Sequence, residues 1–299
     1  MSNRVGVVIP SYNSATFLEE TVASALAQTV PVARIVIIDD ASPDDDSFAI
    51  GQRLAETHPT VISVRQENAG AAAARNAGFE RLGGDVDFVI FLDADDRLAP
   101  DAVARHLAAF EVHPDAVMVM GSNNVIDEAG RVRDEDRIPV EDVDREKLAL
   151  RVTPCPSQCM YRSEAFRQAG RFDPAFRPGD EIDLNLRLER MGRIRSHGAY
   201  VMDYREHEGQ GTRRRVYNAR AHLRALEKNL APGAPAPDPA LYRLARRHWL
   251  ARYGQWQLRA ALGQLRRGNP REAWAAGRLW LDAVPAWTRN ALFGPPRIP

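Results

Sequence analysis

Residues 88–96 read FVIFLDADD, so that five apolar residues lead directly into three carboxylates. A short apolar run of this kind is typical of a strand buried on both faces of a sheet. Asp93, Asp95 and Asp96 would then stand at the carboxyl end of the strand, which is where open parallel sheets bind their ligands. The stretch predicts an α/β protein with an acidic ligand site at one edge of its sheet.

Similar strands alternate with helices on both sides of this stretch. Apolar runs predict strands at 5–10, 35–38, 61–64 and 116–120, and apolar residues at helical spacing predict helices at 14–29, 45–56, 71–82 and 101–110. Ser14 is the expected N-cap of the first helix. Alternating strands and helices form crossover units, so we expect a Rossmann-like, mainly parallel sheet with helices on both faces.

The pattern changes in the second half of the chain. Residues 127–153 are charged and irregular, 158–170 predict a strand and then a helix, 180–191 a helix and 199–204 a late strand. The proline-rich run 231–239 (APGAPAPDP) predicts an extended linker, and the apolar spacing beyond it predicts a helical hairpin. We therefore expect an α/β domain at 1–210 and a helical C-terminal region at 211–299.

Charge is unevenly distributed along the 299 residues. The chain carries 40 basic and 40 acidic side chains, but residues 205–299 hold 18 basic and 6 acidic ones together with all five tryptophans. Helices of this composition either lie on an anionic membrane surface or bury their tryptophans against the first domain or against a second subunit of a homodimer. We favour burial, because amphipathic stripes of soluble proteins usually face a core.

Several classes of protein do not fit the sequence. No run reaches the roughly 18 apolar residues of a membrane-spanning helix, and residues 1–13 do not resemble a signal peptide. We therefore expect a cytoplasmic protein. The C-terminal helices would allow peripheral contact with the inner face of the cell membrane. Cys155 and Cys159 alone make neither a disulfide framework nor a zinc site and are expected to be packing residues. No glycine-rich dinucleotide loop or P-loop follows the first strand, and nucleic acid is not an expected partner.

The carboxylates at 93–96 have two interpretations. Carboxylates that crowd one sheet edge repel one another, and a divalent cation shared with substrate phosphates relieves the repulsion. The simpler alternative is a solvated acidic turn that caps the helix near Asp101.

Four motifs together resemble a known family. The runs VIPSYN (8–13), IIDDAS (37–42), Asn68-x-Gly70 with ARNAG (74–78), and FLDADD (91–96) resemble, in order and spacing, the family 2 glycosyltransferases with the GT-A fold. The resemblance covers about residues 4–210. It implies that about 1–120 bind a nucleotide diphosphate sugar, that about 121–210 bind the acceptor, and that Mg²⁺ or Mn²⁺ assists an inverting transfer.

The resemblance also implies roles for single residues. Pro10, Ser11 and Tyr12 would line the nucleoside pocket, Asp39 or Asp40 would bind the base, and Asp93 would reach the ribose or sugar. Asp95 would bind the metal, with Asp96 as a second ligand or a supporting group and His207 as a metal ligand or a phosphate hydrogen-bonding group. Arg75 would either face the donor or neutralise the acidic cluster.

An inverting transfer needs a base on the acceptor side. The segment Gly179–Arg187, GDEIDLNLR, resembles the family's Glu-Asp-x-Asp-Leu-x-Leu-Arg segment with its first two acids in swapped order. We narrowly prefer Glu181 as the base, with Asp180 as the alternative. Asp183 is expected to pair with Arg187 one turn further on.

The resulting hypothesis is a non-processive inverting glycosyltransferase, because the Gln-x-x-Arg-Trp motif and spanning helices of the processive members are absent from the sequence. The donor would be a UDP-sugar, and the acceptor a saccharide or lipid-linked sugar in cell-surface polysaccharide or glycolipid biosynthesis. The alternatives are a non-catalytic nucleotide-sugar-binding or scaffolding protein and, less favoured, a nucleotidyltransferase.

Overall fold

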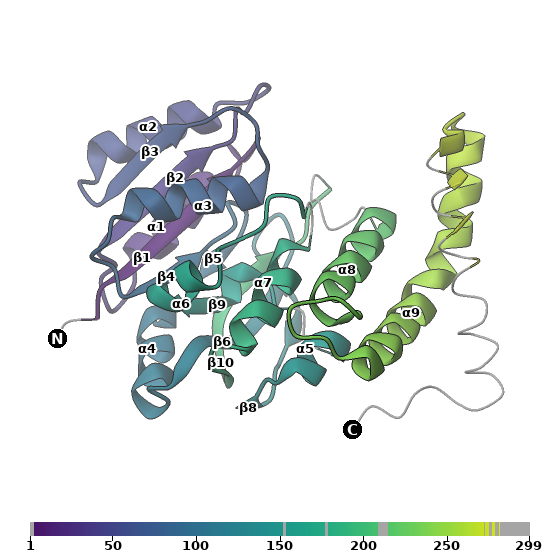
Figure 1. The fold of residues 1–299 in the computed structure, drawn as a ribbon. Helices are drawn as coiled ribbons and strands as arrows, with labels where there is room; N and C mark the ends of the chain where they lie inside the picture. Colours follow the sequence, from purple (N-terminus) through teal and green to yellow (C-terminus); the bar gives the residue numbers. More distant parts are fainter. Residues whose placement is uncertain are drawn as a thin grey trace. The chain divides into compact units, whose positions relative to one another are not determined.

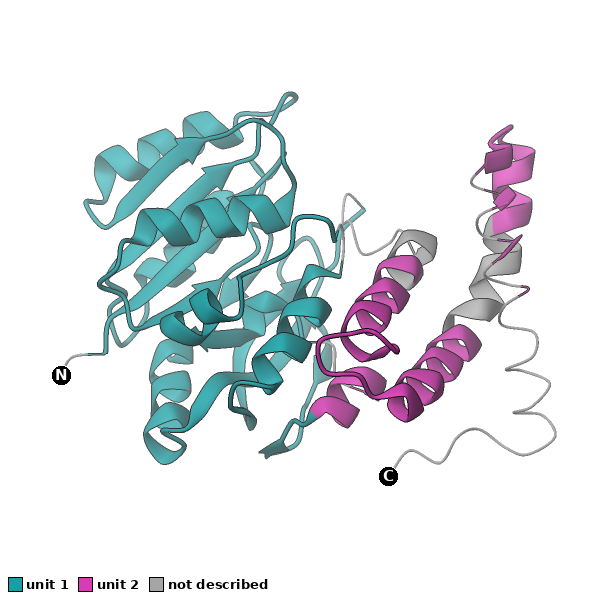
Figure 2. Ribbon diagram, in the orientation of Figure 1, with its two compact units in different colours: residues 1–144, 153–209 teal, residues 145–152, 210–299 magenta. Residues whose placement is uncertain are grey.

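The structure is a computed structural model that describes residues 3–151, 154–176, 179–208, 215–271, 273–274, 277–278 and 281. The chain divides into two compact units, which are considered separately (Figure 2). Unit 1 comprises residues 1–144 and 153–209, and unit 2 comprises residues 145–152 and 210–299. The expected boundary at 210/211 lies outside the described residues.

Unit 1 is an α/β structure (Figure 1). Its strands are β1 (Val5–Ser11), β2 (Arg34–Asp39), β3 (Val61–Arg65), β4 (Phe88–Phe91), β5 (Arg97–Leu98), β6 (Ala116–Ile126), β7 (Val132–Asp136), β8 (Glu141–Asp142), β9 (Cys159–Arg162) and β10 (Arg193–Arg205). Its helices are α1 (Leu18–Leu26), α2 (Ser47–Thr57), α3 (Ala71–Leu82), α4 (Ala102–Val112), the short 3-10 helix η1 (Pro156–Gln158), α6 (Ser163–Gln168) and α7 (Asp180–Glu189).

The strands form one sheet in the order β3-β2-β1-β4-β9-β6-β10-β5, with β7 beside β6 and β8 beside β10. The part built from β3, β2, β1 and β4 is parallel, as predicted, and β6 and β10 are also parallel neighbours. β9 is antiparallel to both β4 and β6 and joins these two parallel parts. The parallel part places the carboxyl ends of β1, β2 and β4 at one edge.

Alternate residues of the central strands face different helices. Val5, Val7 and Ile9 of β1 belong to a core that also contains residues of α1 and α4. On the other face, α3 packs closely against β1, because a Cβ at Gly78 would lie 2.3 Å from Val8 Cγ1 and one at Gly6 would lie 2.6 Å from Leu82 Cδ1. These contacts confirm the predicted helices on both faces of the sheet.

Some helices begin and end at the predicted residues, and others do not. Helix α3 has both predicted ends, and glycines flank it on each side, with Gly70 at φ 86° and Gly83 at φ 83°. Helix α1 begins at Leu18 rather than at Ser14, because the Ser14 carbonyl accepts from the Phe17 and Leu18 N–H groups in a preceding turn. Ser14 is therefore not the N-cap.

The C-terminal half of unit 1 contains more regular structure than expected. β6 runs to Ile126 and β10 begins at Arg193, so both strands are longer than their apolar cores. The charged stretch 127–153 contains β7 and β8 in unit 1, and the helix α5 (Arg145–Leu150), which belongs to unit 2. β7 was not predicted because all five of its residues are exposed, which leaves no apolar alternation to detect.

Unit 2 is helical and consists of α5, α8 (Arg215–Leu230), α9 (Pro239–Arg266) and further helical residues between 270 and 281. The linker ends at Asp238, whose carboxylate caps α9 by accepting from the Leu241 N–H at 2.9 Å, and Pro239 is the first helical residue. Trp249 is buried and donates from Nε1 to the Ala149 carbonyl at 2.6 Å. Trp280 and Trp287 lie outside the described residues.

Candidate functional site

The candidate site lies at the carboxyl ends of β1, β2 and β4. Ser11 at the end of β1 is the register partner of Asp39 at the end of β2, and Asp93 follows β4 by two residues. The start of α7, Arg205 at the end of β10, and His207 after it bring further charged groups to the same set of residues through the hydrogen bonds described below. The parallel pairing thus brings the motifs of the first hundred residues together.

The residues expected to bind the nucleoside lie at the carboxyl ends of β1 and β2. The Ser11 side chain is buried, and among the described residues its hydroxyl has no hydrogen-bond partner. Pro10 is partly buried, whereas the Tyr12 residue is 50% exposed and its ring is accessible for stacking. Asn13, with φ 50°, follows in a left-handed conformation that turns the chain away from the strand.

Asp39 and Asp40 are both buried and differ in their partners. Asp39 accepts from the Ser42 hydroxyl at 2.5 Å and the Ser42 N–H at 3.2 Å. Asp40 accepts three hydrogen bonds, from Gln66 Nε2 at 2.8 Å and from the N–H groups of Ala69 and Gly70 at 2.8 and 2.7 Å. The Asp40 carboxylate therefore holds the loop that leads into α3, and the contact of either residue with a base stays a prediction.

The acidic turn after β4 exposes two of its three carboxylates. The side chains of Asp93 and Asp95 are 29% and 25% exposed, whereas Asp96 is 1% exposed. Burial raises the pKa of Asp95, with repulsion from Asp93 adding to the effect, and burial together with the charges of Asp95 and Asp93 holds the pKa of Asp96 well above its usual range. The turn is an electrostatically costly arrangement that needs positive charge nearby.

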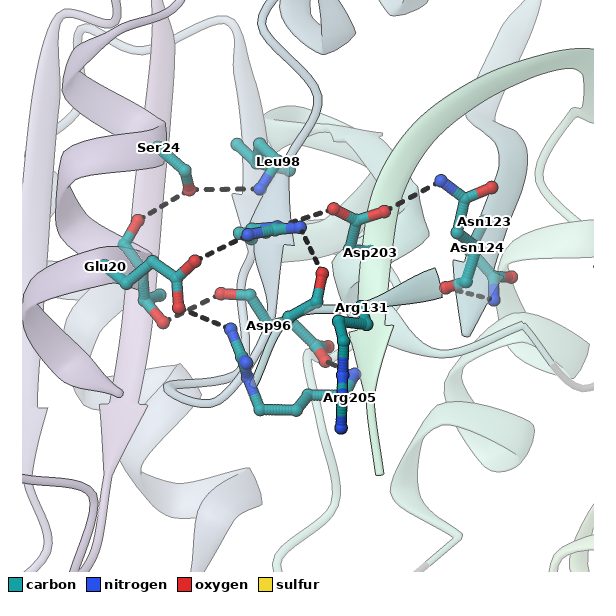
Figure 3. Close-up of polar contacts among 12 residues, drawn as sticks. Glu20, Ser24, Asp96, Leu98, Asn123, Asn124, Arg131, Asp203 and Arg205 are labelled. Carbon is teal, nitrogen blue, oxygen red and sulfur yellow. Dashed lines mark hydrogen bonds and ion pairs between the residues drawn. The ribbon is translucent and has the colours of Figure 1, made fainter. Parts of the chain in front are cut away.

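Arg205, at the end of β10, holds this turn in place (Figure 3). Its Nε donates to the Asp95 carbonyl at 2.8 Å, and its backbone N–H donates to Asp96 Oδ1 at 3.0 Å. Its Nη1 donates to the carbonyls of Asp127 and Glu128 at 3.3 and 3.0 Å. A single buried guanidinium thus ties the acidic turn to the loop between β6 and β7.

Glu20 of α1 links Arg205 to a second arginine (Figure 3). One carboxylate oxygen of Glu20 pairs with Arg205 Nη2 and the other pairs with Arg97 Nη1 at 2.6 Å. Arg97 also donates from Nε to Asp203 at 2.5 Å, and Asn124 Nδ2 donates to the same carboxylate at 2.9 Å. The network therefore connects α1, β5, β6 and β10 beneath the acidic turn.

Asp95 and His207 form the part of the site that fits a metal ion. His207 Nε2 lies 2.9 Å from Asp95 Oδ2, and its ring packs against Phe17 with the centroids 5.1 Å apart. Imidazole nitrogen and carboxylate oxygen are donors that Mn²⁺ accepts, and Mg²⁺ is often held by one or two carboxylates together with substrate phosphates. Among the described residues, no three histidine, cysteine, aspartate or glutamate side chains form a cluster that could hold a metal ion.

Asp96 fits a metal less well than Asp95, because its Oδ1 already accepts from the Arg205 N–H and the residue is buried. Its position suits the supporting role that was the alternative to direct ligation.

Arg75 of α3 joins the two sides of the site. Its Nη2 lies 2.6 Å from Asp93 Oδ1, and its Nη1 lies 2.8 Å from Asp180 Oδ2 at the start of α7. The guanidinium also stacks over Phe172, with Cζ 5.3 Å from the ring centroid, and its side chain is 7% exposed. Arg75 therefore neutralises the acidic cluster, and a contact with the donor stays a prediction.

Glu181 follows Asp180 in the sequence, and the pKa of its carboxyl group is close to the pH range in which a general base works best. Burial and the charge of neighbouring Asp180 raise its pKa to about 8, although Arg75 acts in the opposite direction. Asp180 is committed to Arg75, so the two candidate bases differ in their environments. Asp183 is fully buried and pairs with Arg187 at 2.7 Å, as expected.

Two site residues were not assigned from the sequence. Arg205 lies two residues before His207, but most of its partners are backbone carbonyls, which leave no pattern in the sequence. Ser157, whose hydroxyl accepts from the Asp93 N–H at 3.0 Å, lies in the short helix η1, which was not predicted. The pair Cys155 and Cys159 on either side of it are free thiols, and burial raises the pKa of both.

Comparisons with known proteins identify the family of this chain. The model of the family "Glycosyl transferase family 2" matches residues 6–170. A chondroitin synthase of Escherichia coli is 30% identical over 189 residues, 63% of this chain and 27% of that protein. A putative teichuronic acid biosynthesis glycosyltransferase of Bacillus subtilis is 37% identical over 103 residues, 34% of this chain and 40% of that protein. The matched stretches thus span less than half the length of these relatives.

Solved structures show the same fold. Staphylococcus aureus TarS 1–349 in complex with UDP-GlcNAc matches with a TM-score of 0.63 and 14% identity over 93% of this chain and 92% of that chain. Its complex with UDP matches with a TM-score of 0.59 and 14% identity over 93% of this chain and 91% of that chain. Unit 1 therefore has the predicted GT-A fold. Because the family model matches more than half of the chain, this chain belongs to glycosyl transferase family 2.

Proposed function

We propose that the protein is an inverting glycosyltransferase that moves a sugar from a nucleotide diphosphate sugar to an acceptor hydroxyl. The observation that carries this proposal is the bridge of Arg75 between Asp93, on the donor side, and Asp180, next to Glu181. The bridge places a carboxyl group with a raised pKa beside the acidic turn that would hold the donor. A site of this kind brings together the charge stabilisation and the base that the transfer requires.

In the proposed reaction, the acceptor oxygen attacks the anomeric carbon while the bond from that carbon to the diphosphate oxygen breaks. The bonding electron pair leaves with the diphosphate, and the hydroxyl proton passes to the Glu181 carboxylate. Because attack and departure occur on opposite faces of the sugar, the anomeric configuration inverts. Asp180 is less suited to accept the proton, since its carboxylate is engaged by the Arg75 guanidinium.

Asp95 and His207 would hold a divalent ion, Mg²⁺ or Mn²⁺, next to the donor. When bound, the ion would supply positive charge to the departing diphosphate. Asp96 and Arg205 would keep the acidic turn in position, through the hydrogen bond from the Arg205 N–H to the Asp96 carboxylate. Asp93 would hydrogen-bond the ribose or the sugar.

We favour a UDP-sugar as the donor and a saccharide or lipid-linked sugar as the acceptor. The structural relative TarS was solved with UDP-GlcNAc, which supports a uridine nucleotide. Relatives named for chondroitin and for teichuronic acid biosynthesis support a role in making a cell-surface polysaccharide or glycolipid. The buried Ser11 hydroxyl, the accessible Tyr12 ring and Asp39 would form the nucleoside end of the donor site.

A thermal-shift screen of UDP-, GDP- and dTDP-sugars, with and without Mn²⁺, tests the donor half of this proposal. A ligand that binds the folded state raises the melting temperature by mass action. We expect a UDP-sugar to raise it only when Mn²⁺ is present. Binding without transfer to any acceptor would point instead to the non-catalytic protein, and no shift with any donor would contradict the assignment of the donor site.

A further inference from the structure

The end of α9 and the residues that follow it carry a net positive charge. Residues 262–281 contain four arginines and one acidic residue, Glu272. Arg266, Arg267, Arg271 and Arg278 are all exposed. A helical segment with this many arginines attracts an anionic surface.

The same segment exposes large apolar side chains. Leu262 and Leu265 are 50% and 57% exposed, and Trp274 and Leu281 are 70% and 56% exposed. By contrast, Trp249 and Leu250 in the first half of α9 are 4% and 3% exposed, so burial explains that half. Trp249 is therefore buried within the single chain, whereas Trp274 is exposed in it, and burial of Trp274 against a second subunit stays a prediction.

The exposed apolar residues share helix faces with the arginines. Leu262, Leu265 and Arg266 are three and four residues apart and lie on one face of α9. Trp274, Arg278 and Leu281 are likewise four and three residues apart in the sequence, and the structure describes each of these three residues as helical. Ala261 and Ala273 are buried, which shows that each stretch also has a packed side. We define the interfacial segment by its described exposed residues, which are Leu262, Leu265, Arg266, Arg267, Trp274, Arg278 and Leu281.

We propose that the interfacial segment binds the surface of an anionic phospholipid bilayer. Leucine and tryptophan side chains would enter the boundary between headgroups and acyl chains, while the arginines would pair with lipid phosphates. Indole is suited to this boundary because one end of the ring is apolar and its N–H can bind water or a headgroup. No helix that the structure describes is long and apolar enough to span a membrane, so the contact is a peripheral one.

This surface would bring the enzyme to a lipid-linked acceptor. That consequence depends on the proposed function, but binding to a bilayer does not, because it requires neither donor nor turnover. Failure of one proposal can therefore be distinguished from failure of the other.

Co-sedimentation of the full chain with vesicles tests the proposal. We expect binding to phosphatidylcholine vesicles that contain a fifth of phosphatidylglycerol, and little binding to phosphatidylcholine alone. Each arginine at an anionic surface contributes about five-fold to the affinity, so the Arg266→Glu/Arg267→Glu variant should bind at least about 25-fold more weakly. Leu265→Glu and Trp274→Glu should each weaken binding several-fold, because they remove apolar contact with the bilayer.

Val112→Glu is the matched control, because Val112 in unit 1 is 72% exposed and also lies on a helix. It should leave vesicle binding unchanged, and far-ultraviolet circular dichroism should show that all variants fold. Binding that survives both Leu265→Glu and Trp274→Glu but is displaced by a DNA oligonucleotide would overturn the proposal in favour of a general polyanion site. Conversion of a dimer to a monomer by these variants, with vesicle binding unchanged, would overturn it in favour of self-association.

Discussion

Arg75 and Asp180 are 105 residues apart in the sequence, and the Arg75 Nη1 atom lies 2.8 Å from Asp180 Oδ2 in a contact where both side chains are buried. The same guanidinium holds Asp93 through Nη2 at 2.6 Å. A planar fork with two well-separated donors can hold two carboxylates at once, which an ammonium group cannot do with the same geometry. The bridge therefore fixes the start of α7 relative to the acidic turn.

Arg75→Lys keeps the positive charge and removes the fork, so one of the two carboxylates loses its partner. We expect kcat/KM for transfer to fall about 100-fold, in line with the loss of a buried charged hydrogen bond. Steady-state kinetics and chemical unfolding should be measured together. The matched control is Arg187→Lys, because Arg187 holds Asp183 within α7 by a similar buried pair. Equal losses of activity in both variants would show that Arg75 acts only through the stability of the fold.

The pH dependence of transfer follows from the raised pKa of Glu181. A base acts as the carboxylate, so kcat/KM should rise with pH through a limb near 8, the pKa of this group in the free enzyme. Asp180→Asn removes a neighbouring negative charge, while the positive charge of Arg75 remains. The loss of repulsion and the remaining attraction both favour the Glu181 carboxylate. The limb should therefore move to lower pH in the variant. A limb that stays in place or moves upward would contradict the assignment of this titration to Glu181.

Asp95→Asn tests the assignment of the metal site. The change removes the negative charge from the donor pair of Asp95 and His207, so the Mn²⁺-dependent rise in melting temperature with UDP should disappear. Asp96→Asn is the matched variant, because the asparagine oxygen can still accept from the Arg205 N–H and the pKa of Asp96 is held well above its usual range. It should keep the response to Mn²⁺. Loss of the response in Asp96→Asn alone would reverse the two roles.

Arg205→Lys tests whether the network under the acidic turn positions the metal-binding residues. A lysine cannot bond the carbonyls of Asp95, Asp127 and Glu128 together with Glu20, so the turn should loosen. Loss of such a supporting contact typically weakens metal binding about 10- to 100-fold, which a Mn²⁺ titration of activity would measure. Arg97→Lys should lower stability without this shift, since Arg97 holds Glu20 and Asp203 instead. Identical Mn²⁺ dependence in both variants would count against a positioning role for Arg205.

Local patterns in the sequence predicted the parts of the fold that depend on local chemistry. The helix α3 was predicted with both ends from its helical spacing, and in the structure glycines flank it on each side. The strands β1, β2 and β4 were predicted because buried parallel strands are continuous apolar runs. β7 could not be predicted, since an exposed edge strand carries no such run. Ser14 was a reasonable N-cap by residue type, but a turn after β1 delays the helix to Leu18.

The candidate site was predictable as a set of residues and not as a set of contacts. Motif order placed Asp93, Asp95 and Arg75 in one site, but pairing over 105 residues between Arg75 and Asp180 leaves no local signal. The exposure of Trp274 was also unpredictable, because periodicity marks an amphipathic helix without saying whether its apolar face is covered.

In the proposed reaction, Glu181 removes the proton from the acceptor hydroxyl. The most direct test compares Glu181→Gln with the unmodified protein for donor affinity by calorimetry and for transfer rate under saturating donor and acceptor. Glutamine keeps the shape of the side chain but cannot accept the proton, so donor affinity should stay within about three-fold while the rate falls about 10²- to 10⁴-fold. Full turnover by Glu181→Gln would contradict the assignment and make Asp180 the residue to test next.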